Sequence, residues 1–396
     1  MKKVVFIISQ SLSGGGAERV ASNLSLEFAK NPDYKTYLVL FDGNGRAYPS
    51  GVDVINMDLG PCSGFAKKIM VFFRRIIRLR TLKKKYNVDI SISLLSIPNL
   101  VNILSRVKDS TIVSVRNLIS KSARSRFEKI CVRFSSKCSD KTVALSELVR
   151  IDLIDNFNIP AKKVVTIYNS CDADELLRLT ETSNVDVPKF PYIVTMGRLM
   201  RQKGQWHLIN AFKRVHQQNK NLHLVILGKG ELENPLKKLA QECGISEYVH
   251  FLGYVVNPHL IIKNAQLFIF PSLFEGLGNV LLEAMACGVP VISMDCQAGP
   301  KEIVSKLKEK NDLTKTVSEI TYADYGVLIP AFNPNDAPFE TSRDLSQEEL
   351  YLADAILELI SNNEKLDFYR RQSKERIKDF LPATIMKQWF QLLNGV

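Results

Sequence analysis

Short apolar runs alternate with segments of helical spacing along almost the whole chain. The first run is residues 4–8, and the pattern restarts at Tyr192 after a polar, proline-containing stretch. Strands that alternate with helices predict a parallel sheet covered by helices. Because the pattern occurs twice, we expect an α/β protein of two Rossmann-like domains, residues 1–185 and 186–381, with residues 173–190 as the linker between them.

Residues 267–293 are the most informative part of this pattern. An apolar run ends at Pro271, a loop with two glycines follows, and a helix-spaced segment ends before a second apolar run. In such a unit the loop lies at the carboxyl end of a strand, where open α/β sheets bind ligands, and the amides at the helix start attract anions. Glu275 lies in the loop, and Glu283 lies one turn after Asn279. Both carboxylates are therefore predicted to face one crevice.

A sugar nucleotide would explain why carboxylates lie beside an anion-attracting helix start. Carboxylates and phosphates repel each other unless another group lies between them. Hexose hydroxyls can donate to Glu275 and ribose hydroxyls to Glu283, while the amides at the helix start face the diphosphate. These amides belong to Leu277, Gly278, Asn279 and Val280. On the alternative interpretation, both acids are solvated surface residues.

Two other loops have the composition of a phosphate site. In residues 197–204, Arg198 and Lys203 flank a loop that leads into a helix, so they can oppose two phosphates, although both could equally be solvated charges. Near the amino terminus, Gly15 and Gly16 would let the backbone approach a substrate. The glycine spacing there lacks the dinucleotide fingerprint, and NAD binding is not expected.

Together these segments resemble the family 4 glycosyltransferases, which have the GT-B fold, and in particular those that extend lipid-linked bacterial surface glycans. The resemblance rests on SLFEGLGNVLLEAMACGVPVI, GRLMRQKG, LGKGE, FLGY and GGGAERV, which occur in the family's order. It implies two domains facing across a cleft, with a last helix in residues 382–396 packing back on the N-terminal domain. It also implies that Glu275, Arg198 and Lys203 act in catalysis, the two cations neutralising the diphosphate without a metal ion.

The same resemblance implies further contacts to the donor. Gly15, Gly16, Gly230 and Tyr254 lie in the shared segments. In many relatives a histidine near residue 116 approaches the donor sugar, but this chain has no histidine before residue 207. We expect Arg116, or else Asn117, to take that role.

The formal charge of +12 is unevenly distributed. Residues 1–190 hold 30 Lys and Arg against 18 Asp and Glu, whereas residues 191–396 hold 23 of each. Residues 66–86 contain nine basic residues and no acidic one. We expect this helix to contact anionic lipid headgroups or a lipid-linked diphosphate, through Lys67, Arg74, Arg75, Arg78 and Lys85. The alternative is an ordinary helix whose apolar side packs on the sheet and whose basic side is solvated. Nucleic acid is not an expected partner, because no recognition motif accompanies the charge.

The expected function is transfer of a hexose or N-acetylhexosamine, with retention, from a nucleotide sugar to a polyprenyl-diphosphate-linked oligosaccharide. UDP is the expected nucleotide, and a nucleotide-sugar epimerase or hydrolase is the alternative. No cofactor is expected, and the five histidines are not spaced as metal ligands. No apolar run approaches the roughly 18 residues that span a bilayer, and the seven scattered cysteines suit a reducing compartment. We therefore expect a cytoplasmic protein, peripheral on the inner face of the cell membrane.

Overall fold

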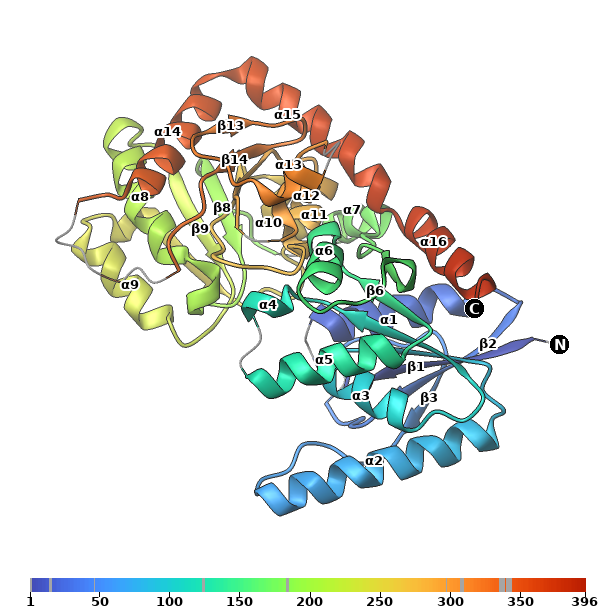
Figure 1. The fold of residues 1–396 in the computed structure, drawn as a ribbon. Coiled ribbons are helices and arrows are strands. Elements are labelled where there is room, and N and C mark those ends of the chain that lie inside the picture. The colour runs from blue at the N-terminus through green and yellow to red at the C-terminus, as the bar shows by residue number, and fades with distance from the viewer. Residues whose placement is uncertain are drawn as a thin grey trace. The chain divides into compact units, whose positions relative to one another are not determined.

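The computed structural model describes residues 2–13, 16–45, 47–122, 125–182, 185–296, 298–306, 310–334, 339 and 344–396. Its contacts divide the chain into two compact units. Unit 1 comprises Met1–Ser170 with Pro382–Val396, and unit 2 comprises Cys171–Leu381. Each unit is built around one seven-stranded sheet with helices packed on it (Figure 1).

The sheet of unit 1 is parallel, in the order β3-β2-β1-β4-β5-β6-β7. Its strands are β1 (Lys3–Ser9), β2 (Tyr34–Leu40), β3 (Asp53–Asn56), β4 (Ile90–Leu94), β5 (Ser110–Val115), β6 (Lys141–Ala144) and β7 (Val164–Thr166). Its helices are α1 (Gly16–Ala29), α2 (Phe65–Lys85), α3 (Ser96–Leu104), α4 (Ile119–Ser122), α5 (Arg126–Cys138), α6 (Glu147–Asp155), the 3₁₀ turn η1 (Ala161–Lys163) and α16 (Pro382–Asn394).

Helices cover both faces of this sheet, as expected for strands that are apolar on both sides. Alternate residues of a strand point to opposite faces. Val5 and Ile7 of β1 belong to a core shared with α1 and α16, whereas Phe6 and Ile8 belong to a core shared with α2 and α3. Trp389 of α16 is buried in the first core, so the last helix of the chain is part of unit 1.

Unit 2 repeats the arrangement, in the order β10-β9-β8-β11-β12-β14-β13, parallel except for β13. Its strands are β8 (Tyr192–Met196), β9 (His223–Leu227), β10 (Val249–Gly253), β11 (Phe268–Phe270), β12 (Val291–Met294), β13 (Thr321–Tyr322) and β14 (Val327–Ile329). Its helices are α7 (Ala173–Glu181), η2 (Arg201–Lys203), α8 (Gln205–Gln218), α9 (Glu233–Glu242), η3 (Ser246–Tyr248), α10 (His259–Lys263), α11 (Asn279–Ala286), α12 (Pro300–Val304), α13 (Lys310–Thr314), α14 (Gln347–Ser361), α15 (Asn363–Arg376) and η4 (Ile377–Phe380). The prediction of two Rossmann-like α/β halves is confirmed.

The predicted linker, residues 173–190, is wrong in its first half, because Ala173–Glu181 forms α7. The side chain of Asp172 caps this helix by accepting from the amide of Glu175, at 3.0 Å. Leu176 and Thr180 are buried, and α7 packs against α10 and α11 of unit 2. The division between the units accordingly falls after Ser170, earlier than the expected boundary at residue 185.

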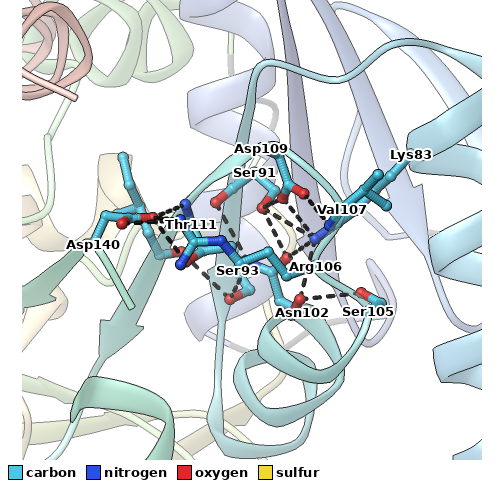
Figure 2. Close-up of polar contacts among 11 residues, drawn as sticks. Lys83, Ser91, Ser93, Asn102, Ser105, Arg106, Val107, Asp109, Thr111 and Asp140 are labelled. Atoms are coloured by element: carbon cyan, nitrogen blue, oxygen red, sulfur yellow. Dashed lines mark hydrogen bonds and ion pairs between the residues drawn. The ribbon is translucent and has the colours of Figure 1, made fainter. Parts of the chain in front are cut away.

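A buried ion pair ties the end of α2 to the sheet of unit 1 (Figure 2). Lys83 Nζ lies 2.7 Å from Asp109 Oδ2, and both side chains are fully buried. Lys83 also donates to Asn102 Oδ1, and Ser91 donates to Asp109. Burial lowers the pKa of Lys83 to about 8, against the opposing effect of Asp109. The hydrogen-bonded network satisfies both charges, which is the condition for burying them.

Candidate active site

The loops at the carboxyl end of the unit 2 sheet bring predicted donor residues together. β8 lies between β9 and β11, so the order of the strands along the chain reverses between β8 and β11. Open α/β sheets bind ligands in the crevice outside the strand ends at such a switch point. The loop after β8 carries Arg198 and Lys203, and the loop after β11 carries Glu275.

Glycines allow these loops to pack closely. A Cβ at Gly204 would lie 2.2 Å from the carbonyl oxygen of Pro271, and a Cβ at Gly230 would lie 2.2 Å from that of Leu199. Gly204 also has a φ of 60°, in the left-handed region that favours glycine. A side chain at Gly204 would push the β8 loop away from the β11 loop. The glycine therefore sets the spacing between Lys203 and Glu275.

Lys203 and Glu275 form an ion pair at this switch point. Lys203 Nζ lies 2.5 Å from Glu275 Oε1, and the two side chains are only 19% and 11% exposed. The ammonium also lies 5.5 Å from the centre of the Phe270 ring, within the range of a cation–π contact. The arrangement holds a donor of hydrogen bonds and an acceptor side by side. Such a pair can bind a phosphate oxygen and a sugar hydroxyl at the same time.

The start of α11 lies in the same loop as Glu275. Gly278 precedes the helix with a φ of 94°, and as the N-cap residue it has no side chain that could cap the first turn. A Cβ at Gly299 would lie 2.3 Å from the backbone of Leu277, so the loop after β12 packs directly against this turn. Asn279 and Val280 are partly exposed. The amides of the first turn and the helix dipole provide a binding place for an anionic group.

Glu283 is buried in the next turn of α11 and contacts a residue that the sequence did not single out. His259 Nε2 lies 3.3 Å from Glu283 Oε2, and His259 Nδ1 lies 2.9 Å from Asn257 Oδ1. The amide group of Asn257 donates to the carbonyl of Leu179 at 2.6 Å, which orients its oxygen toward the imidazole. The contact with Asn257 therefore fixes the orientation of the imidazole, with Nε2 facing Glu283.

His259 and Asn257 thus orient the carboxylate that we expect to bind ribose. No sequence pattern relates them to Glu283, because α10 and α11 meet only in the tertiary structure. Glu283 is 5% exposed, so its rotamer is restricted by its surroundings. The role of Glu283 toward a ribose stays a prediction.

The other predicted residues of unit 2 lie at the same edge of the sheet. Arg198 is exposed, and within the described ranges its guanidinium has no carboxylate partner. Tyr254 follows β10 and is 72% exposed, so its ring is available to a ligand. Gly230 follows β9.

Unit 1 holds the remaining predicted donor residues. Gly15 lies outside the described residues, whereas Gly16 begins α1 with open space where a Cβ would lie. Arg116 follows β5 and is buried, donating to Ser114 Oγ at 3.2 Å and to Asn169 Oδ1. Burial lowers the pKa of Arg116 to about 10, and it lines a pocket with Asn23, Tyr168 and Trp389. Asn117 is exposed instead.

Four of the five cations of α2 predicted to contact a membrane or acceptor are exposed, and one is buried. Lys67, Arg74, Arg78 and Lys85 are exposed, as a surface-binding role requires. Arg75 is not a surface cation, and its assignment to an acceptor or membrane contact is wrong. Its guanidinium donates to the carbonyl of Leu59 and lies 4.8 Å from the centre of the Phe41 ring. One helical turn before the buried Leu79, Arg75 points into the unit instead of outward.

The described part of the chain offers neither a membrane span nor a metal cluster. None of the helices in the described ranges is both long and apolar enough to cross a membrane. No group of three or more His, Cys, Asp or Glu side chains within those ranges could hold a metal ion.

Comparisons with known proteins give family matches in both units of the chain. Residues 14–175 match the family model "Glycosyltransferase Family 4", and residues 181–322 match "Glycosyl transferases group 1". An uncharacterized glycosyltransferase of Methanocaldococcus jannaschii is 32% identical over 75% of this chain and 75% of its own. The N-acetylgalactosamine-N,N'-diacetylbacillosaminyl-diphospho-undecaprenol 4-alpha-N-acetylgalactosaminyltransferase of Campylobacter jejuni is 27% identical over 98% of this chain and 99% of its own.

A solved structure gives the same assignment of the fold. HepE of Anabaena, in complex with UDP, is similar with a TM-score of 0.74 and 17% identity, over 100% of both chains. The solved structures similar to this chain are GT-B glycosyltransferases. The relatives named above are transferases, so the alternative of an epimerase or hydrolase is not supported. The family models, the Methanocaldococcus relative and the two Rossmann-like units together show that this chain belongs to the glycosyltransferases of family 4 and group 1, with the GT-B fold.

Proposed function

We propose that the enzyme transfers a hexose or N-acetylhexosamine from a UDP-sugar to a polyprenyl-diphosphate-linked oligosaccharide of a bacterial surface glycan. The Campylobacter relative, which aligns with almost the whole chain, is named for transfer to a diphospho-undecaprenol-linked sugar. HepE, which has the same fold, was solved with UDP. Unit 2 would bind the donor, and unit 1 would receive the acceptor.

The Lys203–Glu275 pair at the switch point of unit 2 is the observation that carries the proposal. When the bond between the anomeric carbon and the phosphate oxygen breaks, charge develops on the diphosphate. Lys203, Arg198 and the first amides of α11 stabilise this charge. Glu275 accepts hydrogen bonds from the sugar and stabilises the cationic ring. No metal ion is needed in this scheme.

Retention of configuration follows if the acceptor oxygen bonds to the anomeric carbon on the face that the phosphate leaves. The departing phosphate oxygen then takes the proton of the acceptor hydroxyl. No separate general base is required. His259 and Asn257 act as positioning residues for Glu283, which binds the ribose.

Binding and product identity test this function together. Thermal shifts would be measured with UDP-glucose, UDP-N-acetylglucosamine, UDP-N-acetylgalactosamine and GDP-mannose, with and without EDTA. A polyprenyl-diphosphate-linked oligosaccharide should then gain the mass of one sugar residue, at a rate that EDTA leaves unchanged. Release of UDP at the same rate without acceptor, or no stabilisation by any nucleotide sugar, would contradict the proposal.

We further propose that the enzyme is cytoplasmic and peripheral on the anionic inner face of the membrane, through the exposed cations of α2. Each cation near an anionic surface contributes about 1 kcal/mol. The variant K67A/R74A/R78A should therefore bind anionic vesicles about a hundredfold more weakly and use lipid-linked acceptors poorly. Rates with water-soluble acceptors should be unchanged.

A matched control removes three exposed cations from unit 2, as K238A/R370A/K378A. Both triple variants lose the same charge, so a difference between them reports position and not net charge. Equal effects of the α2 variant on both kinds of acceptor would refute the membrane role of α2.

A further inference from the structure

Large apolar side chains are exposed on three helices of unit 1. On α2, Phe65 is 83% exposed, Phe73 58% and Ile77 66%. On α5, Phe127 is 66% exposed, Ile130 63% and Phe134 42%. On α3, Ile97 and Leu104 are each 39% exposed. Contiguous exposed apolar surface on a water-soluble fold marks a contact site, whereas single exposed side chains do not.

The three helices are neighbours on one face of the sheet. α3 packs against both α2 and α5, and Figure 1 shows it between them. The apolar positions form stripes at helical spacing: residues 69, 73 and 77 on α2, and residues 127, 130 and 134 on α5. All three helices connect parallel strands by right-handed crossovers, so they run in the same direction on this face of the sheet. Counted from the buried side of each helix, the exposed apolar stripe of α2 lies on its α3 side, and so does the stripe of α5. The exposed apolar side chains therefore form one band, which we call the α2/α3/α5 face.

Cations lie along the outer sides of this band and at one end of it. On α2, Lys67, Arg74 and Arg78 lie on the other side of the helix from the apolar stripe, and the exposed Arg80 and Lys84 continue the row of residues 73 and 77. On α5, the exposed cations are Arg126, Arg133 and Lys137. The three helices together contain a single acidic residue, Glu128. An apolar band between basic stripes is the pattern of helices that lie in the interface of an anionic bilayer.

Two other occupants fit less well. A second copy of this face would bring two sets of cations together, with Glu128 as the one carboxylate that each copy's three helices contribute. Nucleic acid would neutralise the cations but would leave the phenylalanine and isoleucine side chains without an apolar partner. An anionic bilayer satisfies both the charges and the apolar side chains.

We propose that the α2/α3/α5 face inserts its apolar side chains into the headgroup region of an anionic membrane, with α5 as a second anchor beside α2. This inference rests on the proposed function, and it goes beyond adsorption through the charges of α2. Insertion would hold unit 1 in a fixed orientation on the membrane. A water-insoluble acceptor could then reach the enzyme without leaving the bilayer.

Depth-dependent quenching tests insertion directly. The variant Ile130→Trp places an indole at the centre of the α5 stripe. The chain's own Trp206 and Trp389 are both buried, so their emission should not respond to lipid. With vesicles of phosphatidylglycerol and brominated phosphatidylcholine, the new tryptophan should be quenched relative to unbrominated vesicles. No difference between the two vesicle types would overturn the proposal.

Vesicle sedimentation separates insertion from adsorption. The variant F127S/I130S/F134S should partition onto phosphatidylglycerol vesicles about tenfold less than the parent, because three apolar side chains no longer leave water. F368S changes a phenylalanine on α15 of unit 2 that is as exposed as Phe134, at 42%, and this variant should behave like the parent. At about 1 M salt, where the Debye length is about 3 Å, the parent should keep part of its binding. Complete loss of parental binding at that salt would also overturn the proposal.

The outcomes distinguish this inference from the proposed function. If F127S/I130S/F134S binds vesicles as strongly as the parent and sugar transfer proceeds, only the α2/α3/α5 face is wrongly assigned. If quenching occurs but no nucleotide sugar is used, only the transfer function is wrong. A concentration-dependent dimer that the serine variant abolishes would assign the face to a second copy and overturn the membrane assignment.

Discussion

Glu275→Gln is expected to lower kcat by about a hundredfold to a thousandfold while leaving donor affinity within a few-fold of the parent. Glutamine keeps the size of the side chain and an oxygen that accepts hydrogen bonds. It loses the negative charge that would stabilise an oxocarbenium-like sugar, and this charge matters most in the transition state. Lys203, 2.5 Å from the carboxylate in the parent, would remain available to the diphosphate.

The measurement is kcat with saturating donor, beside the donor Kd from titration. Glu242→Gln on α9, an exposed acid of unit 2, is the control for loss of one negative charge. A melting temperature within a few degrees of the parent would show that the Glu275→Gln variant is folded, since the glutamine oxygen can still accept a hydrogen bond from Lys203. Transfer at the parental rate would refute the assigned role of Glu275.

Lys83→Met is expected to lower the free energy of unfolding by about 3–5 kcal/mol, a larger stability effect than that of any other substitution proposed for this protein. The substitution keeps the length of the aliphatic chain but leaves Asp109 as a buried carboxylate without its cation. The hydrogen bonds from Ser91 and from the amide of Val107 remain, but they do not neutralise the charge. Denaturant unfolding followed by circular dichroism gives the value.

Two comparison variants make the measurement specific to burial. Arg106→Ala removes a neighbouring ion pair with Asp140 whose side chains are 40% and 35% exposed, and should cost about 1 kcal/mol or less. The double variant K83M/D109N removes both buried charges and should recover part of the lost stability. An equal loss of unfolding free energy in Lys83→Met and Arg106→Ala would contradict the special role of the buried pair.

The same pair predicts a dependence on pH. Although burial opposes it, the charge and hydrogen bond from Lys83 hold the pKa of Asp109 below its ordinary value. A carboxylate with a lowered folded-state pKa contributes stability above its unfolded-state pKa, and that contribution is lost as pH falls through the folded-state value. As the pH is lowered, the unfolding free energy of the parent should therefore fall more than that of K83M/D109N.

The sequence predicted the fold because the signals for it are local. Apolar runs such as residues 4–8 and 267–270 are long enough for a strand and too short for a buried helix. The order of strands and helices then restricts the topology, since crossovers between parallel strands are right-handed. Gly204 and Gly278 could be placed at loops for the same reason, because their backbone conformations are local properties.

The sequence did not predict which side chains of α2 are buried. Arg75 and Arg74 are adjacent and chemically alike, but only Arg75 points toward Phe41 and the carbonyl of Leu59. On the alternative interpretation of α2, its apolar side packs on the sheet, yet Phe73 on that side is exposed. Helical spacing groups residues on a face without saying which face the sheet covers.

By itself the sequence determined the two α/β halves, the family and the loops that carry Lys203 and Glu275, because each follows from periodicity or from residues close together in the chain. Only the tertiary structure decided that these two side chains meet, that His259 and Asn257 orient Glu283, and that α2, α3 and α5 share one apolar band. Those relations join residues far apart in the chain, and their distances depend on how helices pack on a sheet, which spacing along a single segment does not specify.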